Sequence, residues 1–166
     1  MRRDFRWPQV RAAPSVTTIL DTLKQTDKVC RLPTKESAKT LVVKAFKECF
    51  EHGHDPRSTP ILIDIDASPR FASYGIDEAK TLTRTRGGDG GPWISTRSRR
   101  VSLEEMAKLQ GFQKGDIQWD ILKITPRQTG QLLGNAVSVN TIGCILEEAL
   151  WSAGLTKEKV PFPRER

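Results

Sequence analysis

Apolar residues recur at the spacing of a helix between Ser37 and Gly53. This apolar stripe comprises Ala38, Leu41, Val42, Ala45, Phe46, Cys49 and Phe50. Such i, i+3, i+4, i+7 spacing predicts an amphipathic helix. Thr34, after Pro33, is its expected N-terminal cap, and Gly53 is its expected terminator. Because Cys49 lies on the stripe, we interpret it as a core residue and not as a nucleophile.

A second pattern has a period of two residues. Residues 61–67, ILIDIDA, alternate apolar and acidic side chains, which predicts a strand with one buried face. Shorter extended pieces are predicted at 72–76 and 92–96, within an irregular stretch that glycines interrupt. Near the N-terminus, VTTILDTLK, residues 16–24, is typical of the start of a short helix.

Helical spacing returns in the C-terminal half of the chain. Ser102 followed by Glu105 is a capping-box pattern, so we interpret Glu105 as a structural residue at a helix start. Two further helices are predicted at 125–133 and 138–154, with a break at 134–135.

Composition limits the class of protein and of partner. The chain has 166 residues, enough for one ordinary domain, and its apolar content of 37% supports a hydrophobic core. The net charge of +7 favours nucleic acid, an anionic membrane surface or an acidic protein as partner. No run approaches the roughly 20 apolar residues of a membrane span, and the first residues do not resemble a signal peptide. We therefore expect an intracellular protein, of a bacterial cytoplasm or a nucleus, with no membrane partner.

Cysteine and histidine spacing gives little support for a metal site. Cys30, Cys49 and Cys144 are odd in number and far apart, so neither a disulfide framework nor a zinc site is indicated. His52 and His54 lie close together, but zinc normally takes three or four ligands and no other cluster accompanies them. We interpret this pair as part of a polar turn that closes the first helix, and we predict no metal.

Residues 81–100, TLTRTRGGDGGPWISTRSRR, form the most unusual stretch. They include five arginines and four glycines but a single acid. Unpaired arginine is costly to bury, and glycine is unfavourable inside helices and strands. We therefore expect this stretch at a surface that faces solvent or an anion. Its Trp93 is a candidate stacking wedge, although we favour a core position for it.

Three pieces of the sequence, in fixed order, resemble the DNA cytosine-5 methyltransferases. RRVSLEEMAKLQGF, residues 99–112, resembles the ninth conserved motif of that family, and GNAVSVNTI, residues 134–142, resembles the tenth. AKTLTRTRGG, residues 79–88, is similar to the segment that opens a recognition loop in the family's target-recognition domain. Gln113 departs from the proline that usually follows the ninth motif. The resemblance covers most of the chain.

The resemblance implies an enzyme whose catalytic half lies outside this sequence. The family's nucleophile is a cysteine in a Pro-Cys motif, aided by a Glu-Asn-Val motif, and its cofactor S-adenosylmethionine lies on a glycine-bearing loop of a Rossmann-like sheet. None of the three cysteines follows a proline, and Glu-Asn-Val does not occur. We expect the smaller subunit of a split enzyme, inactive without a catalytic subunit that carries both motifs. A truncated gene would give the same sequence.

Recognition of duplex DNA is implied for the segment rich in arginine and glycine, because the family must extrude cytosine and hold the duplex around it. If the segment is extended, Arg84 and Arg86 share one side and are candidates for contact with guanine O6 and N7. We interpret the arginines of 97–100 as phosphate contacts, with an ion pair from Arg100 to Glu104 as the alternative. A solvated basic loop without DNA contacts is the alternative for the whole segment. The predicted DNA-binding residues are Thr83, Arg84, Thr85, Arg86, Gly87, Gly88, Arg97, Arg99 and Arg100.

In the tenth motif, the resemblance places Asn135, Ala136 and Val137 near S-adenosylmethionine, mainly bound by the catalytic partner. Asn135 is also suited to cap the helix that follows. Without the catalytic half, the apolar face of that helix lacks its sheet and should be exposed. The residues of this face are Val137, Val139, Ile142, Ile145 and Leu146.

Together these observations predict a mixed α/β fold. The expected parts are an N-terminal helical or connecting segment at 1–60, a small twisted β-rich target-recognition domain at 61–133 and a helix at 134–155 that completes a Rossmann-like domain of another chain. Residues 156–166 are expected to form a flexible tail.

Two other functions remain open on the sequence. One is a DNA-binding regulator or remnant that has lost methylation. The other is a related enzyme acting on transfer RNA, which is disfavoured because the Cys-Phe-Thr signature of that group is absent.

Overall fold

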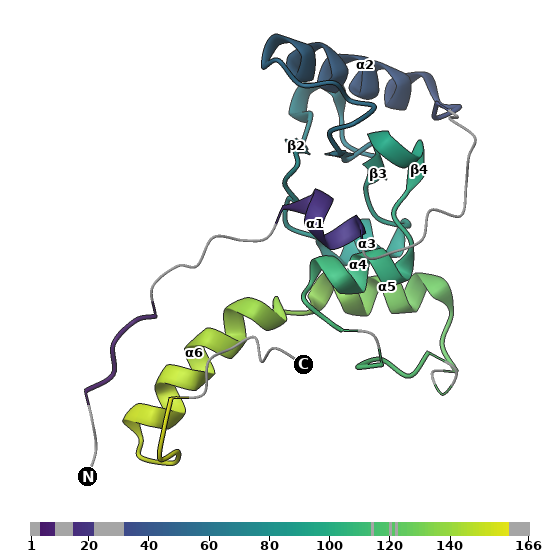
Figure 1. The fold of residues 1–166 in the computed structure, drawn as a ribbon. Helices are drawn as coiled ribbons and strands as arrows, with labels where there is room; N and C mark the ends of the chain where they lie inside the picture. Colours follow the sequence, from purple (N-terminus) through teal and green to yellow (C-terminus); the bar gives the residue numbers. More distant parts are fainter. Residues whose placement is uncertain are drawn as a thin grey trace.

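Six α-helices and one four-stranded antiparallel sheet make up the described part of the chain (Figure 1). The computed structural model describes residues 4–8, 15–21, 32–113, 115–119, 121 and 123–159. The helices are α1 (Val16–Asp21), α2 (Glu36–Glu51), α3 (Arg84–Gly88), α4 (Leu103–Leu109), α5 (Pro126–Asn135) and α6 (Val139–Ser152). The strands are β1 (Ile61–Ile63), β2 (Tyr74–Ile76), β3 (Trp93–Ile94) and β4 (Arg99–Arg100). The short 3₁₀ turns are η1 (Pro69–Phe71) and η2 (Ser95–Arg97). The mixed α/β class is confirmed.

Strand β1 is central in the sheet, whose order is β2-β1-β3-β4. Leu62 lies opposite Gly75 of β2 and opposite Ile94 of β3. All three residues of β1 are buried, because helices cover both faces of the sheet. The prediction of one buried and one exposed face is therefore wrong, and the regular strand ends before the two acids that follow it.

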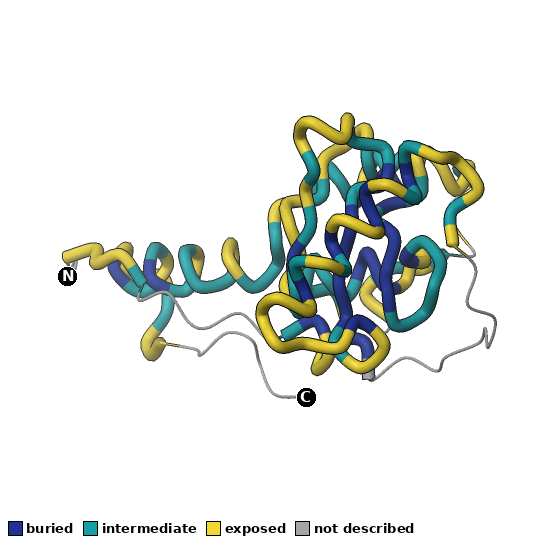
Figure 2. The backbone as a smooth tube through the Cα atoms, turned by 90° about the horizontal axis from the view of Figure 1, so that it is seen from above, coloured by how far each residue is buried: buried dark blue, intermediate teal, exposed yellow. Residues whose placement is uncertain are grey.

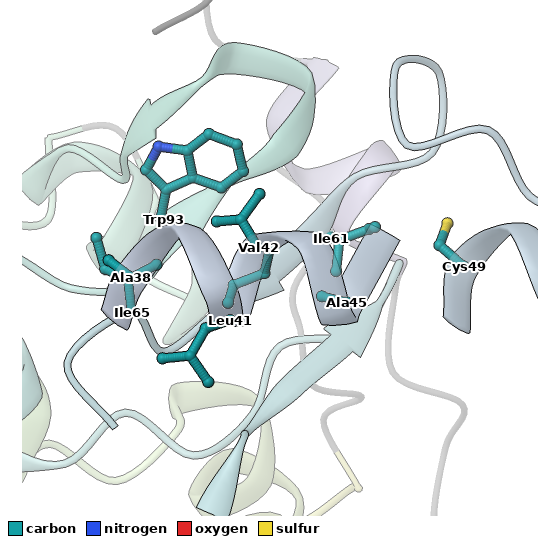
Figure 3. Close-up of a cluster of buried hydrophobic side chains, with 9 residues drawn as sticks. Ala38, Leu41, Val42, Ala45, Cys49, Ile61, Ile65 and Trp93 are labelled. Atoms are coloured by element: carbon teal, nitrogen blue, oxygen red, sulfur yellow. The ribbon is translucent and has the colours of Figure 1, made fainter. Parts of the chain in front are cut away.

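Helix α2 covers one face of the sheet. Figure 3 shows its apolar side chains beside Ile61, Ile65 and Trp93. The core position of Trp93 is confirmed. Cys49 is fully buried, and burial, with a smaller effect of the Asp55 charge, raises the pKa of its thiol.

The sequence predicted one end of α2 correctly and the other incorrectly. Gly53 has φ +77° just after the helix, so the predicted terminator is confirmed. The N-terminal cap is Lys35 without a side-chain hydrogen bond, so the expected cap at Thr34 is wrong. Phe50, at the end of the predicted stripe, is exposed, so its predicted core position is wrong.

A second core lies on the opposite face of the sheet. Leu62 and Ile94 point into it, and Val16 of α1, Met106 of α4 and Leu133 of α5 complete it. The first turn of α1 is tied to the end of β2, because Asp77 accepts hydrogen bonds from the backbone N–H groups at the start of the helix. Figure 2 shows that most of the buried backbone lies in the sheet-containing body. Thus α1 and α2 pack on the sheet, while the division of the chain at residues 60 and 133 stays a prediction.

Helix α6 extends away from the body (Figures 1 and 2). The break between α5 and α6 is confirmed, but Asn135 is the last residue of α5 and Ser138 caps α6, so the capping role expected for Asn135 is wrong. Glu148 of α6 accepts a hydrogen bond from the backbone N–H of Arg6 (3.3 Å) and pairs with Lys159 (2.5 Å).

Some sequence predictions fall on parts that are not described. Residues 160–166 of the predicted tail and Cys30 lie outside the described residues. No helix in the described ranges is both long and apolar enough to cross a membrane.

Candidate nucleic-acid interface

Residues 79–88, which we call the recognition segment, include the short helix α3 where an extended piece was considered. Thr83 caps α3, its hydroxyl oxygen accepting a hydrogen bond from the backbone N–H of Arg86. The expectation that Arg84 and Arg86 share one side is wrong, because side chains two residues apart on a helix diverge by about 200°. Arg84 is exposed, as are Thr83 and Thr85. Within the described ranges the Arg84 side chain makes no hydrogen bond or ion pair.

Arg86 and Arg100 bind the two acids that follow β1. The Nε of Arg86 lies 2.8 Å from Asp64 Oδ2. The guanidinium of Arg100 donates to both carboxylate oxygens of Asp66, each at 2.8 Å. These hydrogen bonds lower the pKa of Asp66 from its ordinary value. The proposed ion pair from Arg100 to Glu104 is wrong, because Asp66 offers a bidentate partner across the sheet.

Arg97 and Arg99 converge on the buried carboxylate of Glu105. Arg97 bonds to this carboxylate and donates a second hydrogen bond to the carbonyl oxygen of Leu20 in α1 (2.8 Å). Arg99 donates to both Glu105 oxygens at 2.8 and 3.1 Å. The backbone N–H of Ser102 also donates to Glu105, and the reciprocal bond confirms the predicted capping box.

The Glu105 side chain is only 1% exposed. Burial on its own would raise the pKa of Glu105. The hydrogen bonds from Arg99 and Ser102 and the charges of Arg99 and Arg97 outweigh burial and hold that pKa below its ordinary value. The buried carboxylate of Glu105 is therefore paired with two arginines and one backbone N–H.

Four of the five arginines in residues 81–100 thus serve internal ion pairs. The Arg97 side chain is only 9% exposed, whereas Arg86, Arg99 and Arg100 keep part of their surface in solvent. Sequence reasoning missed these pairs because their carboxylates lie outside the arginine-rich stretch. Contacts of these arginines with DNA stay predictions. Arg84 is the arginine of the stretch whose guanidinium is most available to a ligand.

The predicted DNA-binding glycines form a close contact between α3 and α5. A Cβ atom on Gly87 would overlap the carbonyl oxygen of Gly130, and one on Gly130 would overlap that of Gly87. Likewise, a Cβ on Gly134 would overlap the carbonyl oxygen of Thr83. The two helices therefore touch backbone to backbone, and Gly87 is buried. Approach of Gly87 and Gly88 to DNA stays untested.

Residues 134–138 comprise the last two residues of α5 and the connection to α6, and they lie beside a cavity. We call them the cofactor loop after the role predicted for Asn135, Ala136 and Val137. The cavity has a volume of about 490 Å³, and its walls include Asp64, Leu82, Arg86, Gln110, Ala136 and Val137. Val137 is 62% exposed, and Asn135 also faces solvent. The recognition segment, the ninth-motif segment and the tenth-motif segment thus all contribute to one cavity. No cluster of metal-ligating side chains occurs in the described ranges.

Gln110 is a site residue that the sequence predictions did not single out. Its side-chain amide donates a hydrogen bond to the carbonyl oxygen of Leu133 at the end of α5 (3.1 Å). The main-chain carbonyl oxygen of Gln110 accepts a hydrogen bond from the backbone N–H of Val139 at the start of α6 (2.8 Å). The one signal for Gln110 in the sequence is its place within the segment that resembles the ninth motif.

Comparison with known proteins identifies a family. The sequence model of one family, described as C-5 cytosine-specific DNA methylase, matches residues 9–151. No curated protein and no solved structure matches the chain significantly. The match spans the arginine-rich stretch, the capping box and the cofactor loop.

Replacement of Glu105 by Gln should destabilise the fold by about 3 to 5 kcal/mol, because Arg97 and Arg99 lose their shared countercharge. Folding lowers the pKa of Glu105, so its ionised form stabilises the folded state at pH values above the unfolded-state pKa of about 4.3. This stabilisation is lost as the pH falls through the folded-state pKa. The difference in unfolding free energy between wild type and Glu105→Gln should therefore shrink on acidification. Urea unfolding from pH 3 to 7 measures it. The exposed neighbour Glu104→Gln is the control, and an equal loss in both variants contradicts the role of Glu105.

Replacement of Gly130 by Ala tests the contact between α3 and α5. In an ordinary helix this change stabilises by about 0.5 to 1 kcal/mol. Here the added Cβ meets the Gly87 carbonyl oxygen, so we expect a loss of about 1 to 3 kcal/mol instead. Thermal unfolding gives the sign directly. The control is Leu132→Ala, at an exposed position of α5, and a stabilised Gly130→Ala variant would show that the helices are not in backbone contact.

Proposed function

Because the chain belongs to the C-5 cytosine-specific DNA methylases, we propose that it is the target-recognition part of a DNA cytosine-5 methyltransferase. In this proposal it binds duplex DNA and acts with a catalytic subunit that carries the Pro-Cys and Glu-Asn-Val motifs. Enzymes of this family transfer a methyl group from S-adenosylmethionine to cytosine C5.

The exposed apolar face of the α6 region carries the proposal. Val137, Ile142, Leu146 and Leu150 are all exposed. The last three are spaced four residues apart, so they form one stripe along the helix. Exposed apolar patches of this kind mark interaction surfaces. A sheet of the catalytic half is the partner that suits a long apolar helix in this family, and α6 would then complete its Rossmann-like domain.

The cysteines support a division of labour between two polypeptides. None of the three follows a proline in the sequence. Cys49 is enclosed between α2 and the sheet, and its raised pKa opposes formation of the thiolate that a nucleophile requires. We therefore assign no catalytic residue to this chain and propose that the chain is inactive alone.

The cofactor loop fits one wall of a site for S-adenosylmethionine, which supplies the methyl group when bound. Ala136 and Val137 offer small apolar surfaces, and the amide of Asn135 faces solvent beside them. Asp64 is the carboxylate in the wall of the cavity, but it already pairs with Arg86. We propose that the partner supplies the groups that balance the positive charges of the cofactor.

The exposed start of α3 is the proposed surface for base recognition. Arg84 extends from it, next to the hydroxyl side chains of Thr83 and Thr85. The net charge of +7 favours approach to a polyanion. A guanidinium that has no partner among the described residues is suited to bidentate hydrogen bonding with guanine.

Methyl transfer tests the proposal directly. Labelled S-adenosylmethionine and duplex DNA are incubated with this chain, with the polypeptide that copurifies with it, and with both. We expect incorporation into DNA only in the mixture that contains both. DNA binding without methylation in any mixture would favour a non-catalytic DNA-binding module, and methylation by this chain alone would contradict the absence of a nucleophile.

Arg84→Ala tests base recognition. If Arg84 contacts guanine, the variant should lose about 1 to 3 kcal/mol of binding free energy on the preferred sequence and should relax specificity at one position. Fluorescence anisotropy with a library of labelled duplexes measures both effects. The control is Arg57→Ala, which removes the same charge from an exposed position between α2 and β1. Uniform weakening over all duplexes in both variants contradicts base readout by Arg84.

A further inference from the structure

Gln110 is bonded to both ends of the cofactor loop. Its side-chain amide holds the carbonyl oxygen of Leu133, one residue before the loop. Its main-chain oxygen holds the N–H of Val139, one residue after the loop. Gly111, with φ +89°, directs the chain away so that Asn140 packs closely against it. One residue of the ninth-motif segment therefore fixes the separation of the two helices that carry the loop.

The recognition segment contacts the same loop from the other side. The Thr83 carbonyl oxygen lies so close to Gly134, the first residue of the loop, that no Cβ fits between them. One turn further along α3, Gly87 and Gly130 make the matching backbone contact. A displacement at the start of α3 therefore meets the backbone of Gly134 directly, without an intervening flexible side chain.

We propose that Gln110 is a positioning residue that holds the cofactor loop against the start of α3, so that DNA bound at α3 stabilises the loop. This inference rests on the proposed function. The proposed link between α3 and the cofactor loop consists of three contacts. Two are the backbone contacts of α3 with Gly130 and Gly134, and the third is the hydrogen bond from the Gln110 side-chain amide. Without the amide, the main-chain bond to Val139 remains but the direct bond from Gln110 to α5 is lost, so ordering of α3 and α5 is no longer passed through Gln110 to Val139.

The test is amide hydrogen exchange of the full chain, measured with and without a duplex that it binds. The reporter is the N–H of Val139, which is hydrogen-bonded to Gln110. With DNA at about 100 times its dissociation constant, linkage allows a slowing of up to about 100-fold, and we expect at least about tenfold in the wild type. In Gln110→Met, which keeps the side-chain length but lacks the donor, the slowing should fall below about twofold.

Matched controls separate positioning from general stability. Gln113→Met makes the same change at an exposed site three residues away and should keep the wild-type slowing. The amide of Leu62 in the central strand should exchange equally slowly in all variants, which shows that the fold is intact. A purely structural role for Gln110 changes exchange in the free and bound states alike and leaves their ratio unaltered, and that result would overturn the proposal.

The outcomes also separate this proposal from the proposed function. If the wild type binds no duplex DNA, both fail. If it binds DNA without slowing exchange at Val139, DNA recognition stands and the positioning role of Gln110 is overturned. Retention of DNA binding by Gln110→Met, together with loss of the slowing at Val139, supports both.

Discussion

A single buried carboxylate connects elements that lie far apart in the chain. Glu105 binds arginines from η2 and β4 and the backbone that begins α4, while Arg97 extends the same network to α1. A buried charge is tolerated only when its partners stay in place. The network therefore fixes α4 relative to the sheet edge, and α4 in turn positions Gln110, α5 and the cofactor loop.

Local signals in the sequence predicted much of this arrangement. The stripe of α2 and the capping box at Ser102 and Glu105 depend on residues a few positions apart, which periodicity detects. The pairs Asp64 with Arg86 and Asp66 with Arg100 join residues 22 and 34 positions apart. Alternation in residues 61–67 predicted that the acids would line one face of a strand, but no local pattern indicates that these acids meet the arginine-rich stretch. The sequence therefore predicted an exposed basic segment where the structure has a largely neutralised one.

The candidate site shows the same limit. Family resemblance identified three segments and their order, but their meeting point at Gln110 depends on tertiary packing. Gly87 was expected to allow approach to DNA, which stays a prediction, and in the structure it allows close approach of α3 to Gly130 of α5. Both uses require the same small residue, so sequence alone does not separate them. Arg84 is a predicted residue whose exposed side chain, with no ion pair among the described residues, agrees with the expectation for a ligand-facing group.

The backbone contact of α3 with α5 also limits which positions of α3 can change. On the side of α3 that faces α5, Gly87 is confined by Gly130, and a larger residue at either position requires the helices to separate. The solvent side, where Arg84 and Thr85 lie, has no such restriction. Outward side chains on α3 can therefore be exchanged on a fixed helix without rebuilding the wall formed by residues 134–138, which in the proposed role of α3 would change DNA preference and leave that wall intact.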